Sequence, residues 1–339
     1  MIALFLKLFF IIPIWLLKLI TFRKRVLVNG QILDYQTQIF LGLQSFESID
    51  LGSFDSAEEV RETITKKQMG LPINAKPTSK VLLQDHIIDE DGLSLAVREY
   101  VPDILLHSNP ILYFHGGGYV LGSIESHDPW LKLFSSHMQS NIFSLEYRLA
   151  PENKFPAALK DANQALEWIA KKNDISISSI SICGDSAGAH LAASLSIYRA
   201  MNNLELPHSQ CLIYPMADPS CTSESQQAFQ IGYGLTKDAM MWFWDQLFHS
   251  KEDLSDPRFN LLLNNDIKPL PKTIIVTAGF DPLCDEGEEY ARKLFDAGND
   301  VQQIHYPHLI HGFVNMTSLQ SANKAALDLI KTYGTYFKT

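Results

Sequence analysis

The sequence predicts an α/β fold in which helices cover both faces of a mostly parallel central sheet. Short apolar runs alternate with helical patterns along most of the 339 residues, which is typical of such folds. A Gly-Asp-Ser-Ala-Gly pentapeptide at 184–188 joins a β-type run at 177–183 to a helical pattern at 189–200. This strand, sharp turn and helix form the context in which such folds present a reactive serine.

Residues 1–25 are apolar and basic. Apart from Lys7, Pro13 and Lys18, the first twenty residues are all apolar, and three cationic residues end the segment. About 20 apolar residues can span a bilayer, whereas two lysines eleven positions apart share one face of a helix lying in the membrane interface. We therefore expect this segment to associate with a membrane surface, with both placements open. Packing on the protein itself or on a dimer partner is the alternative.

The expected elements follow in order. A helical pattern at 34–43 precedes a polar segment at 45–67, and residues 80–102 predict two antiparallel strands joined by an Asp-Gly turn at 89–92. The remaining patterns predict strands at 110–114, 141–147, 210–215, 272–278 and 301–306, and helices at 128–138, 157–171, 236–249, 286–297 and 318–337.

Residues 217–262 interrupt the alternation of strands and helices. Their aromatic and methionine-rich helix at 236–249 is either part of the core or a lid over an apolar pocket. In the connector before the helix at 157–171, Arg148 and Glu152 are expected to form an ion pair that braces the neighbouring loops.

Ser186 is the candidate nucleophile, held in a strained turn between Gly184 and Gly188, which let strand and helix approach closely. A serine hydroxyl is a weak nucleophile at neutral pH, so it needs a base, an acid that orients the base, and donors for the developing oxyanion. Three consecutive glycines follow the strand at 110–114 and leave their N–H groups uncovered. We expect the N–H groups of Gly116, Gly117 and Ala187 to hold the oxyanion.

The acid and the base are expected further along the chain. Asp281 is the first acid after the strand at 272–278 and is preferred to Asp285, which is expected in the next helix together with Glu286. His311 is preferred as the base to His308, the other loop candidate, while His305 lies within a strand pattern. The chain order Ser…Asp…His is that of α/β-hydrolases.

Six motifs carry a resemblance to a known family. In order along the chain they are HGGGY at 115–119, YRLAPE at 147–152, FPAAL at 155–159, GDSAG at 184–188, DPLCDEG at 281–287 and HGF at 311–313. Residues 26–339 resemble the hormone-sensitive-lipase family of carboxylesterases, which includes arylacetamide deacetylase and many bacterial esterases. The sequence departs from the family pattern at Glu146, Ala189 and Cys284, where aspartate, glycine and arginine are usual.

The resemblance implies an α/β-hydrolase fold with a helical cap and assigns Ser186 as nucleophile, Asp281 as acid and His311 as base. It also implies that residues 26–78 form the N-terminal part of the cap. Residues 79–339 would then form the catalytic domain, with a cap or lid insertion near 217–262.

Composition excludes several classes of partner. The net charge is −10, and the first 33 residues hold five cationic and no acidic side chains, which leaves about −15 on the remainder. This argues against nucleic acid as a partner.

The four cysteines show no CxxC spacing and are expected to be reduced. No HExxH motif occurs, and three nearby histidines do not make a convincing zinc site. We expect no metal and no cofactor.

The sequence thus predicts a serine hydrolase that cleaves small-molecule esters with short- to medium-chain acyl groups through an acyl-enzyme. A membrane-associated lipase and an arylacetamide-type deacetylase are the alternatives, and a non-catalytic small-molecule receptor on the same fold is a remote one, because His311 is intact. The cationic residues after the apolar run favour a cytoplasmic side for the domain; a cytoplasmic protein is the alternative, and a homo-oligomer remains open.

Overall fold

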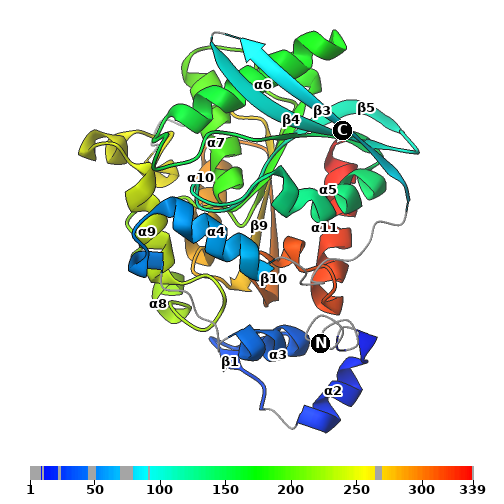
Figure 1. The fold of residues 1–339 in the computed structure, drawn as a ribbon, viewed down its shortest axis with the longest axis vertical. Coiled ribbons are helices and arrows are strands. Elements are labelled where there is room, and N and C mark those ends of the chain that lie inside the picture. Colours follow the sequence, from blue (N-terminus) through cyan, green and yellow to red (C-terminus); the bar gives the residue numbers. More distant parts are fainter. Residues whose placement is uncertain are drawn as a thin grey trace.

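A computed structural model describes residues 9, 11–21, 24–44, 51–68, 79–90, 92–263 and 269–337 (Figure 1). Most of the polar segment predicted after the first helix is described, but its residues 45–50 are not. The predictions for residues 1–8 and 69–78, and for Asp91 in the first hairpin turn, also lie outside the described residues.

An eight-stranded sheet forms the centre of the fold in the order β10-β9-β8-β7-β5-β6-β4-β3. The pairs β3–β4 and β4–β6 are antiparallel and the other pairs are parallel, so the predicted mostly parallel sheet is confirmed. The strands are β3 (Val81–Glu90), β4 (Leu93–Pro102), β5 (His107–Phe114), β6 (Ser140–Leu145), β7 (Ser181–Asp185), β8 (Ser209–Ile213), β9 (Lys272–Phe280) and β10 (Val301–Ile310).

Helices cover both faces of this sheet, as Figure 1 shows. Along β5, Leu112 and Phe114 join the core beneath one set of helices, whereas Ile111 and Tyr113 join the core beneath the other. Successive side chains of a strand point to opposite faces, so a strand buried on both sides has to be apolar throughout. The first set is α6 (Ala157–Asn173), α7 (Ala187–Met201) and α10 (Cys284–Asp296), and the second is α5 (Ile124–Met138) and α11 (Gln320–Phe337).

Three predicted boundaries are wrong for local reasons. Residues 177–179 form a short 3-10 turn, so β7 begins only at Ser181. Helix α5 begins one turn earlier than predicted, because the Ser123 hydroxyl accepts a hydrogen bond from Ser126 N and caps it. Strand β10 extends to Ile310, which places His308 in the strand and not in a loop.

The N-terminal elements pack against the end of the sheet that also carries His311. They comprise α2 (Ile14–Thr21), β1 (Leu27–Val28), β2 (Gln31–Ile32), α3 (Tyr35–Gln44), a 3-10 turn (Leu51–Ser53) and α4 (Ala57–Gln68). Leu17 of α2 is buried in one core cluster with Tyr35 of α3, and Asp34 N donates to His308 O at 2.9 Å. Among the described residues, no helix has the length and apolar character that a membrane span requires.

The predicted ion pair between Arg148 and Glu152 is wrong. Arg148 instead binds Asp161 of α6 through its guanidinium and its backbone N–H, at 2.6 and 2.9 Å. Glu152 pairs with Arg61 of α4 at 2.8 Å, and Arg61 also donates to the carbonyls of Val120 and Ala150. The connector between β6 and α6, which contains Arg148 and Glu152, is therefore held in place by α6 and by α4.

Asp161 is expected to stabilise the fold far more than Glu152. The Asp161 side chain is 0% exposed, whereas that of Glu152 is 52% exposed. Arg148 is 32% exposed and can be solvated once its partner is removed, but the loss of several charge-assisted hydrogen bonds from a buried carboxylate remains. Asp161→Ala should therefore lower the free energy of unfolding by about 2 kcal/mol, and Glu152→Ala by less than about 1 kcal/mol. Urea unfolding of both variants measures this; equal losses would contradict the assignment of the pair.

Candidate active site

Ser186 lies in the sharp turn between β7 and α7. Its backbone φ of 56° and ψ of −119° fall in a sparsely populated region that a serine adopts only under constraint. A Cβ added to Gly184 would lie 2.3 Å from the Gly188 carbonyl carbon, and one added to Gly188 would lie 2.0 Å from Phe114 O. Both positions therefore require glycine, as the sequence predicts, and the serine hydroxyl is presented at the carboxyl end of the strand.

A continuous hydrogen-bond chain joins Ser186, His311 and Asp281. His311 Nε2 lies 2.9 Å from Ser186 Oγ, and His311 Nδ1 lies 2.8 Å from Asp281 Oδ2. A carboxylate only accepts hydrogen bonds, so Nδ1 carries the proton and Nε2 is left to accept from the serine hydroxyl. The three residues follow β7, β9 and β10, whose carboxyl ends meet at one edge of the sheet.

Neighbouring groups hold the members of this chain in place. Leu283 N donates to Asp281 Oδ1 at 2.9 Å, which orients the buried carboxylate. The ring of Tyr214 lies 4.5 Å from that of His311. Gly312, with a φ of 78°, turns the chain directly after the histidine.

The two alternatives named for the acid and the base lie elsewhere. Asp285 Oδ2 accepts from Ser225 N at 2.7 Å, so this carboxylate fastens α8 (Glu224–Ala228). His308 lies within β10, three residues before His311.

Two further histidines, His115 and His190, lie near the glycine loop. Burial lowers the pKa of His115 to about 3 and that of His190 to about 4, so both imidazoles are neutral and structural.

The glycine loop is arranged differently from the prediction. Gly116 N donates to Asp185 Oδ1 at 3.0 Å, so this N–H is already engaged and the expectation that it holds an oxyanion is contradicted. No group in the described chain accepts a hydrogen bond from the N–H of Gly117 or Gly118, whose φ values are 126° and 62°. Ala187 is the first residue of α7, where N–H groups have no partner within the helix.

The carboxylate of Asp185 is buried next to Ser186 and gathers the surrounding loops. Donors from several elements contact it: Tyr113 Oη at 2.7 Å, Gly116 N at 3.0 Å, His127 Nε2 at 3.2 Å, Asn315 Nδ2 at 3.3 Å and Tyr214 Oη at 3.4 Å. Burial alone raises the pKa of this group, but His127 and the Tyr113 hydroxyl stabilise the carboxylate, and the net effect lowers its pKa below 3.8. Sequence reasoning missed this role, although the acid stands inside the pentapeptide.

The aromatic helix predicted at 236–249 is α9 (Lys237–Leu247), and its inner face belongs to the core. Met240, Phe243, Trp244 and Leu247 are buried, whereas Met241 is exposed. A Cβ at Gly118 would lie 2.2 Å from the Phe243 ring, so the helix packs directly on the glycine loop. This helix is therefore part of the core and at the same time covers the loop beside Ser186.

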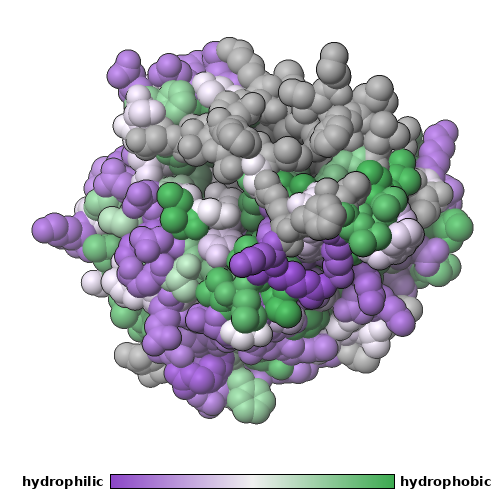
Figure 2. Space-filling view, turned by 90° about the horizontal axis from the view of Figure 1, so that it is seen from below, coloured by the Kyte–Doolittle hydropathy of each residue, from purple (hydrophilic) through white to green (hydrophobic). Residues whose placement is uncertain are grey.

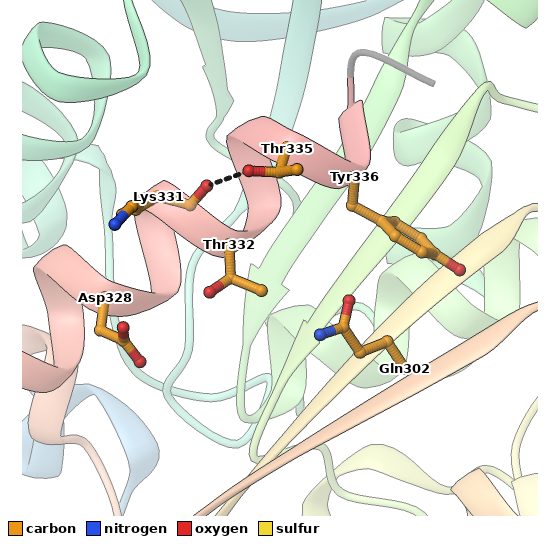
Figure 3. Close-up of a pocket in the computed structure, with 6 residues that line it drawn as sticks. All are labelled: Gln302, Asp328, Lys331, Thr332, Thr335 and Tyr336. Carbon is orange, nitrogen blue, oxygen red and sulfur yellow. Dashed lines mark hydrogen bonds between the residues drawn. The ribbon is translucent and has the colours of Figure 1, made fainter.

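A separate pocket lies away from these residues, between β10 and α11 (Figure 3). It measures about 350 Å³ and is lined by Gln302, Asp328, Lys331, Thr332, Thr335 and Tyr336. The Thr335 hydroxyl in this pocket donates to the Lys331 carbonyl at 3.1 Å. The lining contains no nucleophile paired with a base, so we do not assign it to the chemistry.

Comparison with known proteins agrees with the fold described above. A family model described as alpha/beta hydrolase fold matches residues 111–315. Ethyl acetate hydrolase of Pseudomonas putida is 36% identical over 236 residues, covering 68% of this chain and 74% of that protein. Carboxylic ester hydrolase LipN of Mycobacterium tuberculosis is 31% identical over 312 residues, covering 89% of this chain and 82% of that protein.

Solved structures with the same architecture are also similar in sequence. A serine-to-alanine mutant of LAE6, an alpha/beta hydrolase enzyme from the metagenome of Lake Arreo, superposes with a TM-score of 0.83 at 31% identity, covering 91% of this chain and 99% of that one. A hyperthermophilic esterase from the archaeon Pyrobaculum calidifontis superposes with a TM-score of 0.82 at 31% identity, covering 90% of this chain and 98% of that one.

Replacing Asp185 with asparagine should destabilise the protein in a pH-dependent way. Because the folded-state pKa is lowered from 3.8, the stabilisation by this carboxylate is fully present above pH 3.8 and is lost as pH falls through the folded-state value. We expect Asp185→Asn to cost about 3 kcal/mol at pH 7, with the difference from wild type shrinking below about pH 4. Urea unfolding across this pH range provides the measurement, and a pH-independent difference would argue against an ionised carboxylate.

Proposed function

This chain belongs to the alpha/beta hydrolase fold family and is a carboxylic-ester hydrolase of the hormone-sensitive-lipase group, and on that premise we propose that it cleaves short- to medium-chain acyl esters through Ser186, His311 and Asp281. The observation that carries the proposal is the chain of two hydrogen bonds, 2.9 and 2.8 Å long, from Ser186 Oγ through His311 to Asp281. This is the relation between nucleophile, base and orienting acid that acyl transfer requires.

The reaction proceeds in two halves. His311 Nε2 accepts the hydroxyl proton as Ser186 Oγ attacks the ester carbonyl carbon, and the same nitrogen then protonates the departing alcohol. The acyl group remains on Ser186 until a water molecule, deprotonated by His311, attacks it and releases the acid. Asp281 stays ionised throughout, holding the imidazole in one tautomer and stabilising the imidazolium.

The oxyanion is held by backbone N–H groups, and we propose Gly117, Gly118 and Ala187 in this role. The engagement of the Gly116 N–H with Asp185 supports the shift by one residue along the loop, since the next two N–H groups have no acceptor in the described chain. Such donors are fixed before the reaction begins, and each is worth about 2.7–4 kcal/mol of the barrier in comparable enzymes.

The cap over this site is proposed to include residues 26–78 and the insertion at 217–262. Two contacts support this. Arg61 of α4 donates to Val120 O and Ala150 O, both at 2.7 Å, in the loops beside the site. Phe243 of α9 packs against Gly118. Ser186 itself is buried, so the acyl chain would have to enter beneath these elements, which favours substrates of modest size.

The N-terminal helix presents an apolar surface, and we propose that it rests on an anionic lipid surface. Trp15 and Leu19 of α2 lie four residues apart and are 64% and 58% exposed, while Leu17 is buried against the protein. Ile11, which precedes α2, is 76% exposed. Figure 2 shows hydrophobic side chains on this underside of the molecule beside hydrophilic ones. The exposed cations Lys18, on α2, and Lys24 and Arg25, shortly after it, would complement acidic headgroups.

If α2 rests on a lipid surface, the enzyme would act close to membrane lipids, which favours the lipase alternative. The helix contacts the protein through one face, so it would lie in the plane of the membrane and not cross it. The segment that follows it reaches β10 near His311, where Asp34 N binds His308 O. Substrate dissolved in the bilayer would then be close to the cap.

Ser186→Ala should abolish ester hydrolysis. We expect kcat/KM for p-nitrophenyl esters to fall by roughly five to six orders of magnitude, because the nucleophile is absent while the fold is intact. Ser194→Ala is the matched control, since this buried hydroxyl lies on α7, which begins directly after Ser186, and has no hydrogen-bond partner among the described residues. Rates for a series of esters from acetyl to palmitoyl show which acyl lengths the pocket accepts. Loss of activity in Ser194→Ala, or retained activity in Ser186→Ala, would refute the assignment of Ser186 as the nucleophile.

Binding to lipid vesicles should depend on the exposed face of α2. The double substitution Trp15→Ala and Leu19→Ala should weaken binding to phosphatidylserine-containing vesicles more than about tenfold, because each buried large apolar side chain contributes about 1.5–3 kcal/mol. Phe295→Ala, at an exposed apolar residue on α10, should leave binding unchanged. Co-sedimentation at low and high salt measures this; equal binding by all variants, or a concentration-dependent dimer with no vesicle binding, would exclude the lipid surface.

A further inference from the structure

A second cluster of reactive side chains lies on the far side of the acid loop. We propose that Cys284, Glu288 and His305 form a binding site for one divalent transition-metal ion of the zinc class. Cys284 Sγ lies 3.8 Å from Glu288 Oε1, and that oxygen lies 3.3 Å from His305 Nδ1. One ligand atom from each residue falls within 4.8 Å of the others.

These separations suit a tetrahedral ion. Zinc binds sulfur at about 2.3 Å and imidazole nitrogen or carboxylate oxygen at about 2.0–2.2 Å, so two ligand atoms in a tetrahedral site lie about 3.4–3.7 Å apart. The sulfur–oxygen and oxygen–nitrogen distances of 3.8 and 3.3 Å are already close to this spacing. Small side-chain movements would complete three bonds and leave the fourth position for water.

The histidine is oriented as a metal ligand would be. With the Gln31 amide turned so that its nitrogen donates to Gly279 O and Pro307 O, at 3.1 and 3.3 Å, its oxygen accepts from His305 Nε2 at 3.2 Å. The proton on Nε2 then leaves a lone pair on Nδ1, the atom that faces Glu288. A hydrogen bond from the outer nitrogen to an amide or carbonyl oxygen is the usual support of a metal-bound histidine.

That lone pair and the Glu288 carboxylate are two acceptors that face each other. Without an ion, the Thr277 hydroxyl, 2.9 Å from Nδ1, can donate to the histidine, and the Cys284 thiol donates to Glu288 Oε1 at 3.8 Å. An ion would replace these two weak arrangements with direct bonds to the nitrogen, the carboxylate and the sulfur. A zinc-class ion uses all three groups, because thiolate, imidazole and carboxylate are its ligands.

Access from solvent is compatible with a metal site at this place. The thiol is buried, whereas the side chains of Glu288 and His305 are partly exposed and leave a path for an ion from solvent. The expectation of no metal depended on motif spacing along the chain, whereas the ligands of this cluster come from two separate elements, α10 and β10.

The site would act as a clamp and take no part in the ester chemistry. Its ligands come from the first two turns of α10 and from β10, the elements that follow Asp281 and precede His311. Cys284 N donates to Asp281 O at 3.1 Å, so a bound ion would tie the acid loop to the strand that leads to the base. Metal binding to the folded state alone raises its stability.

Cobalt titration of the full chain, after treatment with a chelator, tests the site without relying on enzyme activity. The wild type should develop a thiolate-to-cobalt charge-transfer band in the near ultraviolet that saturates at one ion per chain and is displaced by zinc. The band should be lost in Cys284→Ser, and the affinity should be at least about tenfold weaker in His305→Gln. Zinc should raise the melting temperature of the wild type but not that of Cys284→Ser.

Two matched variants complete the test. Cys221→Ser removes another buried thiol, and His308→Gln removes a histidine from the same strand; both should titrate like the wild type. Melting without metal confirms that each variant is folded. No thiolate band in the wild type, or a band that survives Cys284→Ser, would overturn the proposal and leave the His305–Glu288 ion pair as the function of the cluster.

Discussion

The buried carboxylate of Asp185 is the interaction on which the arrangement of the active site depends. A charge inside a protein is tolerated only when several donors converge on it, and this one gathers donors from β5, the glycine loop, α5 and the loops after β8 and His311. Each of those segments carries or supports a group that the proposed chemistry needs. Satisfying one charge therefore places the glycine loop and His311 relative to Ser186, the next residue in the chain.

The strained turn at Ser186 is the second constraint, and the close packing around it makes the strain sustainable. With a positive φ the serine costs about 1–3 kcal/mol on its own. The surrounding sheet and helix are buried on all sides, and glycine at 184 and 188 lets β7, α7 and β5 approach so closely that no side chain would fit. The core therefore holds the serine in a conformation that presents its hydroxyl to His311.

Much of this could be predicted from the sequence, because it depends on local patterns. Apolar runs predicted the strands, and the order of Ser186, Asp281 and His311 predicted which side chains would meet, as their hydrogen bonds now show. The failures concern partners chosen by tertiary approach. Arg148 binds Asp161 and not the nearer acid, and the N–H of Gly116 finds a carboxylate 69 positions away, a contact that no local spacing reveals.

The central claim is that Ser186 is acylated during turnover. The most direct measurement is mass spectrometry of the protein quenched within milliseconds of mixing with p-nitrophenyl acetate, followed by peptide mapping. We expect a transient acetyl group on the peptide that contains Ser186, formed at the rate of the first burst of p-nitrophenol. Hydrolysis without any acyl adduct, or with the adduct on another residue, would contradict it.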